Sequence, residues 1–178
     1  MALGNGGSGL SVSYVGVSPG TISSNTIANN NGSGVLVGPG SLTFGNHVAI
    51  NCNSIFANIG LGSDLTPQGT VNCTTPPPGP NDYTQCPVIL SAKTSQVSGT
   101  ACANCTIEIY IATNEGNDLG HGEGKTFLGS ATAIGSGNWS LALSAGQVSA
   151  GQILTATATT TSSPLETSEF GVNVVVGS

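Results

Sequence analysis

The feature that most constrains this chain is a repeat within residues 1–63. Residues 22–30, ISSNTIANN, return 28 residues later as residues 50–58, INCNSIFAN. A second pattern, GSGLSV at 7–12, returns as GSGVLV at 32–37 and, more loosely, within residues 59–65. A fixed period of this length indicates one supersecondary unit per repeat, stacked on its copies.

Each repeat contains short alternating apolar runs broken by Gly and Asn, which is typical of short strands joined by sharp bends. Asn25 and Asn30 recur as Asn53 and Asn58. Asn side chains at equal repeat positions can stack as a hydrogen-bonded ladder. We therefore predict a short parallel β-helix of about two to three coils over residues 1–72. The alternative is a β-meander whose Gly and Asn turns recur by chance.

A Pro-rich segment follows the repeats. Residues 73–86 contain the run PPPGP, which favours extended backbone and does not fit inside a sheet. This composition predicts a linker over residues 73–86 and a second domain over residues 87–178. About seven short runs of strand-forming residues, separated by turn signals, predict an antiparallel immunoglobulin-like β-sandwich in that domain. Its expected strands are Val88–Ala92, Val97–Thr100, Thr106–Ala112, Thr126–Ala133, Asn138–Ser144, Ile153–Thr160 and Glu169–Val176.

The clearest alternation lies in residues 106–112. Ile107, Ile109 and Ile111 are predicted to face the core, and the residues between them, Glu108 and Tyr110, to face solvent. No segment predicts an amphipathic helix. The expected fold class is therefore all-β.

Several motifs carry a family resemblance, and together they cover nearly the whole chain. Residues 53–62 (NSIFANIGLG) and 79–89 (GPNDYTQCPVI) resemble the last coil and exit linker of bacterial secreted right-handed parallel β-helix repeat proteins. Four later motifs resemble the immunoglobulin-like module that follows such helices. They are GTACANCTIEIY at 99–110, GHGEGKTFLG at 120–129, TATAT at 155–159 and TSEF at 167–170. The resemblance implies a right-handed helix in a large extracellular or surface-attached protein, usually without assigned catalysis, and names no ligand.

The charge content excludes several partner classes. Only 6% of the residues are charged, the formal net charge is −6, and Lys93 and Lys125 are the only basic residues. Phosphate backbones and anionic membranes are bound largely through Lys and Arg, so we expect no nucleic acid and no membrane surface as a partner. No apolar run is long enough for membrane insertion. The first residues lack the regions of a signal peptide, so we expect a piece of a longer secreted chain.

The same scarcity of charge argues against catalysis. Residues 1–63 carry no Asp, Glu, Lys or Arg, and the helical region and linker offer only His47, Asp64 and Asp82. One carboxylate cannot act as both general acid and general base, so we predict no catalytic residue and no enzyme. The expected function is that of an extracellular structural or adhesive surface protein, with a self-assembling filament subunit as one form. The alternative is a glycan- or calcium-binding module of a larger secreted protein.

One acidic loop is the weak candidate for a metal site. Glu115, Asp118 and Glu123 could supply oxygen ligands to Ca²⁺, although their spacing is not that of an EF-hand. The competing interpretation is a hairpin loop held by Gly turns, with Lys125 paired to a carboxylate. No other cofactor is expected.

The chain has five cysteines. We predict disulfides between Cys73 and Cys86, which bracket the Pro run, and between Cys102 and Cys105, which suits an oxidising compartment. A link between Cys52 and Cys73 is the rival pairing. Otherwise Cys52 is expected to be a small apolar filler within a coil.

The ends of the predicted helix suggest self-association. A terminal coil exposes unpaired N–H and C=O groups, and the first coil, around Leu10 and Val12, has no charged residue to protect it. We predict that it stacks on upstream coils or on another copy of the chain, head to tail, giving filaments. The last strand is a second candidate for pairing with a neighbour, through Phe170, Val172, Val174 and Val176. The alternative is a monomer.

Overall fold

The computed structural model describes residues 4–13, 20–38, 47–75, 79–113 and 118–178. Within these residues the chain is all-β, with one 3₁₀ turn, η1 (Pro80–Tyr83), and no α-helix. Parallel sheets occupy the first part of the chain, and antiparallel sheets occupy the second. The fold class predicted from the sequence is therefore confirmed.

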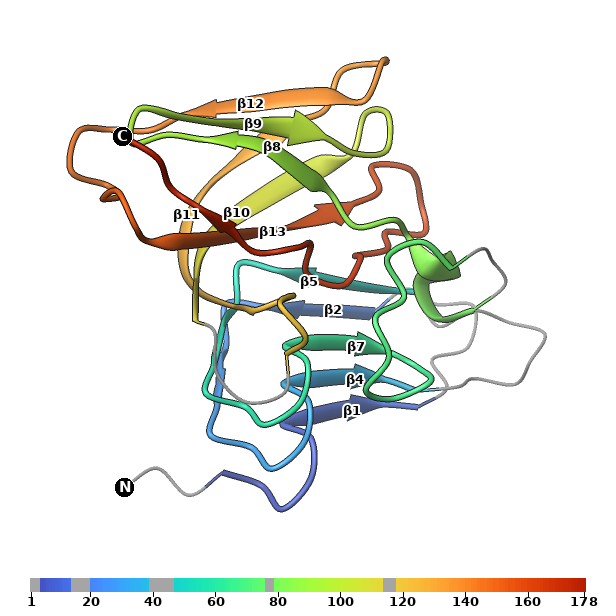
Figure 1. Ribbon diagram of the computed structural model, residues 1–178. Coiled ribbons are helices and arrows are strands. Elements are labelled where there is room, and N and C mark those ends of the chain that lie inside the picture. The colour runs from blue at the N-terminus through green and yellow to red at the C-terminus, as the bar shows by residue number, and fades with distance from the viewer. Residues whose placement is uncertain (1–3, 14–19, 39–46, 76–78, 114–117) are drawn as a thin grey trace.

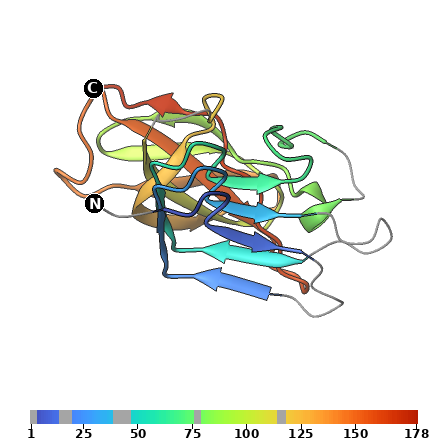
Figure 2. The same ribbon diagram turned by 90° about the horizontal axis from the view of Figure 1, so that it is seen from below.

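The first part is a short parallel β-helix (Figure 1). Its strands are β1 (Leu10–Val12), β2 (Gly20–Ser23), β3 (Thr26–Ala28), β4 (Val35–Val37), β5 (Val48–Asn51), β6 (Ser54–Phe56) and β7 (Ser63–Leu65). They form the parallel sheets β1-β4-β7, β2-β5 and β3-β6. Viewed from below, the strands of successive coils lie one beside the next (Figure 2).

The register between coils follows the sequence repeat. Ile22 pairs with Ile50, and Ile27 pairs with Ile55, at the offset of 28 residues seen in the sequence. Strand β4 pairs with β1 on one side and with β7 on the other, so the looser repeat within residues 59–65 is also a true one. These pairings confirm both predicted repeats. The repeats exist because stacking places equivalent apolar residues over one another in the helix interior.

The corners of the coils repeat as well. Left-handed backbone occurs at Ser24 and again at Cys52, with φ of 59° and 53°. It occurs also at Asn29 and Ala57, with φ of 60° and 56°. Each corner residue lies directly before a ladder Asn, so the sharp bend positions the Asn carboxamide between coils.

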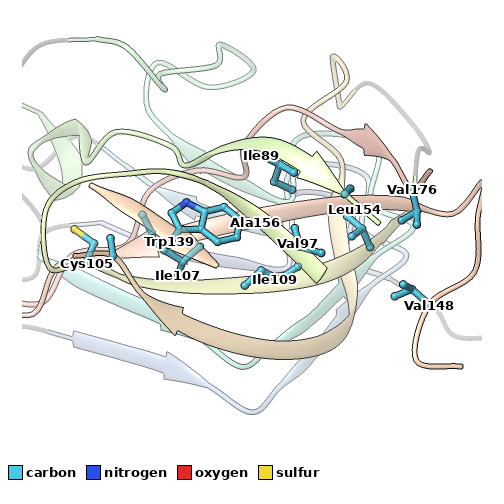
Figure 3. Close-up of a cluster of buried hydrophobic side chains, with 13 residues drawn as sticks. Ile89, Val97, Cys105, Ile107, Ile109, Trp139, Val148, Leu154, Ala156 and Val176 are labelled. Carbon is cyan, nitrogen blue, oxygen red and sulfur yellow. The ribbon is translucent and has the colours of Figure 1, made fainter. Parts of the chain in front are cut away.

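The second part is an antiparallel sandwich. Its strands are β8 (Val88–Ala92), β9 (Gln96–Thr100), β10 (Thr106–Thr113), β11 (Glu123–Thr132), β12 (Asn138–Ala142), β13 (Ile153–Thr159) and β14 (Val174–Val175). One sheet has the order β12-β9-β8, and the other has the order β11-β10-β13-β14. Trp139, Ile107 and Leu154 meet in the core between them (Figure 3).

Two details of the sandwich differ from the sequence-based expectation. The last strand is limited to Val174–Val175, although Ser168 and Gly171 upstream of it still donate backbone hydrogen bonds to Ala158 and Ala156 of β13. Glu108 and Tyr110 are buried, with exposed fractions of 5% and 2%, so the prediction that they face solvent is wrong. The outer face of β10 is turned toward the β-helix, where Tyr110 joins the helix's own apolar cluster.

Candidate functional site

The two ends of the β-helix differ in how their backbone groups are satisfied. At the end formed by β5, β6 and β7, the sandwich and the η1 turn supply hydrogen-bond partners to the last coil. We call this the capped end. At the other end lie the outer edges of β1, β2 and β3, which we call the open end. In Figure 1 the sandwich lies above β5, and β1 lies farthest from it.

Strand β5 shows how the cap works. The amides of Val48, Ile50 and Cys52 point away from β2, because alternate residues of a strand face opposite edges. Each of the three amides donates to a side chain, at 2.7–2.9 Å: Asn81 Oδ1, Thr167 Oγ1 and Glu108 Oε2. Side chains from three separate segments thus take the place of a further parallel strand.

The Asn81 side chain bonds to both the amide and the carbonyl of Val48, the first residue of β5. Its Oδ1 accepts the Val48 amide at 2.7 Å, and its Nδ2 donates to the carbonyls of Val48 and Thr167, each at 2.7 Å. Asn81 and the next two residues, Asp82 and Tyr83, all have left-handed backbone, which Asn and Asp tolerate but which costs roughly 1–2 kcal/mol for a residue such as Tyr83. The three hydrogen bonds of the Asn81 side chain offset part of this cost.

Glu123 continues a ladder of asparagines. The Asn5 amide donates to Asn30 Oδ1 at 3.0 Å, and the Asn30 amide donates to Asn58 Oδ1 at 3.1 Å. The Asn58 amide then donates to Glu123 Oε2 at 3.0 Å, and Asn58 Nδ2 donates to Oε1 at 2.6 Å. A carboxylate of the sandwich therefore occupies the position that the next Asn of the ladder would take.

Glu169 caps the remaining strand. Its Oε1 accepts the amide of Leu65, the last residue of β7, at 2.7 Å, and its Oε2 accepts the Asn72 amide at 2.5 Å. Burial raises the pKa of Glu169 to about 7, partly offset by these hydrogen bonds. Three glutamates that are at most 5% exposed, at positions 108, 123 and 169, thus meet the last coil in a chain with eight acidic residues.

The open end has no such partners among the described residues. No described strand pairs with the outer edges of β1, β2 or β3. Alternation places the amides of Thr21 and Ser23 on this edge, because Gly20 bonds toward β5. A shallow concavity of ≈ 240 Å³ lies here, lined among others by Asn5, Leu10 and Ile27.

The ladder asparagines at the open end accept no hydrogen bond at Oδ1 from any described residue. Asn30, Asn53 and Asn58 each accept at Oδ1 from the Asn one coil earlier. Asn5 and Asn25 are the first ladder residues of the described coils, and no described residue donates to their Oδ1 atoms. The open end therefore offers acceptors and strand amides together.

The predicted self-association residues fall into two groups. Leu10, 40% exposed, and Val12 lie on β1 at the open end, as expected. Phe170 and Val176 are buried, at 3% and 2%, and Val174 lies in β14, which pairs with β13. Only Val172 of that group is well exposed. The last strand is thus used within its own chain, and the expectation of a free donor strand is not met.

The two described carboxylates of the acidic loop, Asp118 and Glu123, have separate partners. Glu123 is engaged at Asn58, and Asp118 is buried, with Oδ1 accepting the Gly120 amide at 3.0 Å. Glu115 lies outside the described residues. Over the described parts of the chain, no three His, Cys, Asp or Glu side chains lie close enough to hold a metal ion. Lys125 lies over the Phe56 ring, 4.8 Å from its centroid.

The cysteines pair as predicted. Disulfides join Cys73 to Cys86 and Cys102 to Cys105, and the rival link from Cys52 is not formed. The expectation of Cys52 as an apolar filler is wrong. It is exposed at a left-handed corner, and its thiol donates to Glu108 Oε1 at 3.2 Å.

Two of the three groups considered for catalysis, Asp64 and His47, have structural partners, and the third, Asp82, is exposed. Asp64 is fully buried and accepts hydrogen bonds from Ser33 Oγ at 2.6 Å and from the Gly69 amide at 2.9 Å. Burial raises its pKa. His47 Nδ1 contacts Glu166 Oε1 at the boundary with the sandwich. The two residues are thus held in separate places by different partners.

Sequence reasoning missed the capping residues Asn81, Glu108 and Glu169. The one available signal concerned Glu108. Only 6% of the residues are charged, so a glutamate between the isoleucines of a predicted strand is unusual in this chain. A carboxylate in that position either faces solvent or is buried with a hydrogen-bonding partner, and the sequence alone does not distinguish the two.

Comparisons with known proteins leave the family open. No protein-family model matches the chain, and no curated protein matches it. Among solved structures, one described as "Biofilm associated protein - BSP domain" aligns with 55% of this chain at 21% sequence identity and a TM-score of 0.38. This chain covers 15% of that protein's length. A likeness at this level carries no argument about function. Within the described residues, no helix is long and apolar enough to span a membrane.

Proposed function

We propose that this chain is an extracellular, non-enzymatic structural module of an adhesive surface protein, in which the sandwich closes one end of a β-helix. The observation that carries the proposal is the difference between the ends. The last coil donates its edge amides to buried side chains of the cap, whereas no described strand pairs with the outer edge of the first coil. Such a unit is a terminal element of a solenoid, since solenoids need capping units at their ends.

The disulfides support the extracellular part of the proposal. Disulfides persist in oxidising compartments and are rare in the cytosol. The Cys73–Cys86 disulfide closes the segment that carries Asn81 into a loop, so an oxidising environment would also restrain the cap. The scarcity of charge, at 6% of residues, leaves few groups for acid–base catalysis.

Amide hydrogen exchange tests the capping role within one molecule. At low protein concentration, we expect slow exchange for Val48, Ile50 and Cys52, whose amides are bonded to cap side chains. Thr21 and Ser23 on the equivalent edge of β2 serve as matched controls and should exchange fast. Equal exchange rates at the two edges would rule out the capping role.

Labelling of intact source cells tests location. An antibody against the sandwich should label cells without permeabilisation if the module is on the surface, or the protein should be recovered from the medium. Labelling that requires permeabilisation, with no protein in the medium, would contradict the extracellular proposal.

A further inference from the structure

A small cavity lies between the last coil of the β-helix and the sandwich. Its volume is ≈ 10 Å³, and the residues that line it are all buried. Apolar walls come from Ile50, Ile55 and Phe170, among others, and the hydroxyl-bearing side chains of Ser63 and Thr157 also line it. A cavity of this size holds about one water molecule, provided that polar groups are present to bind it.

Two hydroxyl groups at this cavity have no hydrogen-bond partner among the described residues. They are Ser63 Oγ, from the last coil, and Thr157 Oγ1, from the sandwich. The two residues are only 2% and 3% exposed, so bulk solvent does not satisfy them. Native proteins rarely leave a buried hydroxyl without a hydrogen bond, because the lost hydration is then not replaced.

The neighbours of Thr157 show how hydroxyls on this face of β13 are used. Thr155, Thr157 and Thr159 share one face of the strand, because alternate residues point the same way. Thr155 Oγ1 donates to the Gly171 carbonyl at 2.8 Å, and Thr159 Oγ1 donates to Asn51 Oδ1 of the last coil at 3.1 Å. Strand β13 lies next to β5 in Figure 1. Of the three threonines, Thr157 therefore needs a partner that the described residues do not supply.

We infer that this cavity binds one water molecule, which bridges Ser63 Oγ and Thr157 Oγ1 and so joins the β-helix to the sandwich. The inference rests on the proposed capping role, because the cavity lies at the capped end. Asn53 offers a third polar group at the cavity. Its Nδ2 donates to the Ile22 carbonyl at 2.8 Å, which uses one of its two protons. A buried water makes about three hydrogen bonds, and these three side chains can supply them.

Oxygen-17 magnetic relaxation dispersion of the whole chain tests the site, because it detects water molecules that stay bound while the protein tumbles. Thr157→Val removes one hydroxyl at nearly constant shape and should reduce the dispersion by the contribution of one water. The matched control Thr132→Val, at an exposed residue of β11, should leave it unchanged. Equal dispersion in the wild type and in Thr157→Val would overturn the inference. A high-resolution crystal structure of the wild type tests it without any variant, and lack of density for a water between the two hydroxyls would also overturn it.

The stability of the variants gives a second readout, in which the sign decides. Loss of a bound water should lower the folding equilibrium constant of Thr157→Val about two- to tenfold. An unsatisfied hydroxyl would give the opposite sign, since its replacement by an apolar group removes an unpaired buried donor. A chain with both Ser63→Ala and Thr157→Val should lose no more than the larger single loss, because either change alone releases the water. Additive losses would mean that the two hydroxyls have separate partners, which contradicts a shared water.

The bound water and the capping role can be refuted separately. Slow amide exchange at Val48, Ile50 and Cys52, together with a dispersion that Thr157→Val does not change, would refute the water and leave the capping role intact. Fast exchange at these three amides would refute the capping role, and the inferred water bridge with it.

Discussion

At the scale of single residues, the closing of the β-helix depends on side chains that imitate a strand. The Asn81 carboxamide does this most completely, since it donates and accepts at Val48 as a peptide group would. The left-handed turn that presents it is otherwise unfavourable for non-Gly residues. A strained conformation is thus kept because the contact it permits satisfies buried backbone groups.

Replacement of Asn81 should therefore destabilise the chain strongly. Asn81→Ala removes three hydrogen bonds and leaves the Val48 amide and the Thr167 carbonyl unpaired, while the Val48 carbonyl still accepts from the Thr167 amide, at a cost of about 2–4 kcal/mol in the free energy of unfolding. Asn81→Asp should cost at least as much, because it sets a carboxylate oxygen against those carbonyls. The control Asn138→Ala changes an exposed residue and should stay within about 0.5 kcal/mol. Urea unfolding measures all three, and similar values for Asn81→Ala and the control would refute the role.

At the scale of elements, the segment predicted as a linker is part of the cap. Asn81 bonds to β5, and Tyr83 donates from its hydroxyl to the Thr66 carbonyl at 2.8 Å. The Cys73–Cys86 disulfide closes this segment into a loop with a sequence separation of 13. Its Pro content and its disulfide both reduce the conformational freedom that the unfolded segment would otherwise have.

Loss of that disulfide should cost more than loss of the second one. Cys73→Ser with Cys86→Ser should lower the free energy of unfolding by about 3 kcal/mol on the chain-entropy model. Cys102→Ser with Cys105→Ser opens a loop with a separation of only 3, so the same model gives about 2 kcal/mol. Guanidinium unfolding of the two double variants checks the order. A reversed order would show that the Cys73–Cys86 loop does not constrain the cap.

At the scale of the whole molecule, burial raises the pKa of three carboxyl groups, those of Asp64, Glu166 and Glu169. Burial is the largest cause of the raised pKa of Asp64, Glu166 and Glu169. Hydrogen bonds to each carboxylate work in the opposite direction but do not cancel the effect. The folded state therefore binds protons at these groups more tightly than the unfolded state does.

This difference makes stability depend on pH. For Glu169, the pKa is about 7 when folded and 4.5 in its ordinary range, so its contribution is full below about pH 4.5 and is lost as the pH rises through 7. We expect Glu169 to contribute roughly 2 kcal/mol between pH 8 and pH 5, or roughly 4–8 °C in the melting temperature. Glu169→Gln should flatten this dependence. A wild-type melting temperature that falls from pH 8 to pH 5 would contradict the expected sign.

The sequence by itself determined the β-helix register and the positions of most strands of the sandwich. The spacing of Ile27 and Ile55, and of Asn30 and Asn58, recurs because stacked coils repeat the same local geometry. Strand β8, for example, has the predicted limits Val88–Ala92. Alternation over a few residues reports which side chains share a face, and this information is local.

Only the tertiary structure decided what each face meets. The Ile50 amide and the Thr167 hydroxyl are 117 residues apart in sequence, and no local pattern encodes their meeting. Glu108 follows the alternation of an outward residue, yet it is buried because the β-helix covers that face of the sandwich. The same docking supplied partners to the last coil of the helix. Burial depends on how two folded parts pack, and periodicity within either part does not contain that information.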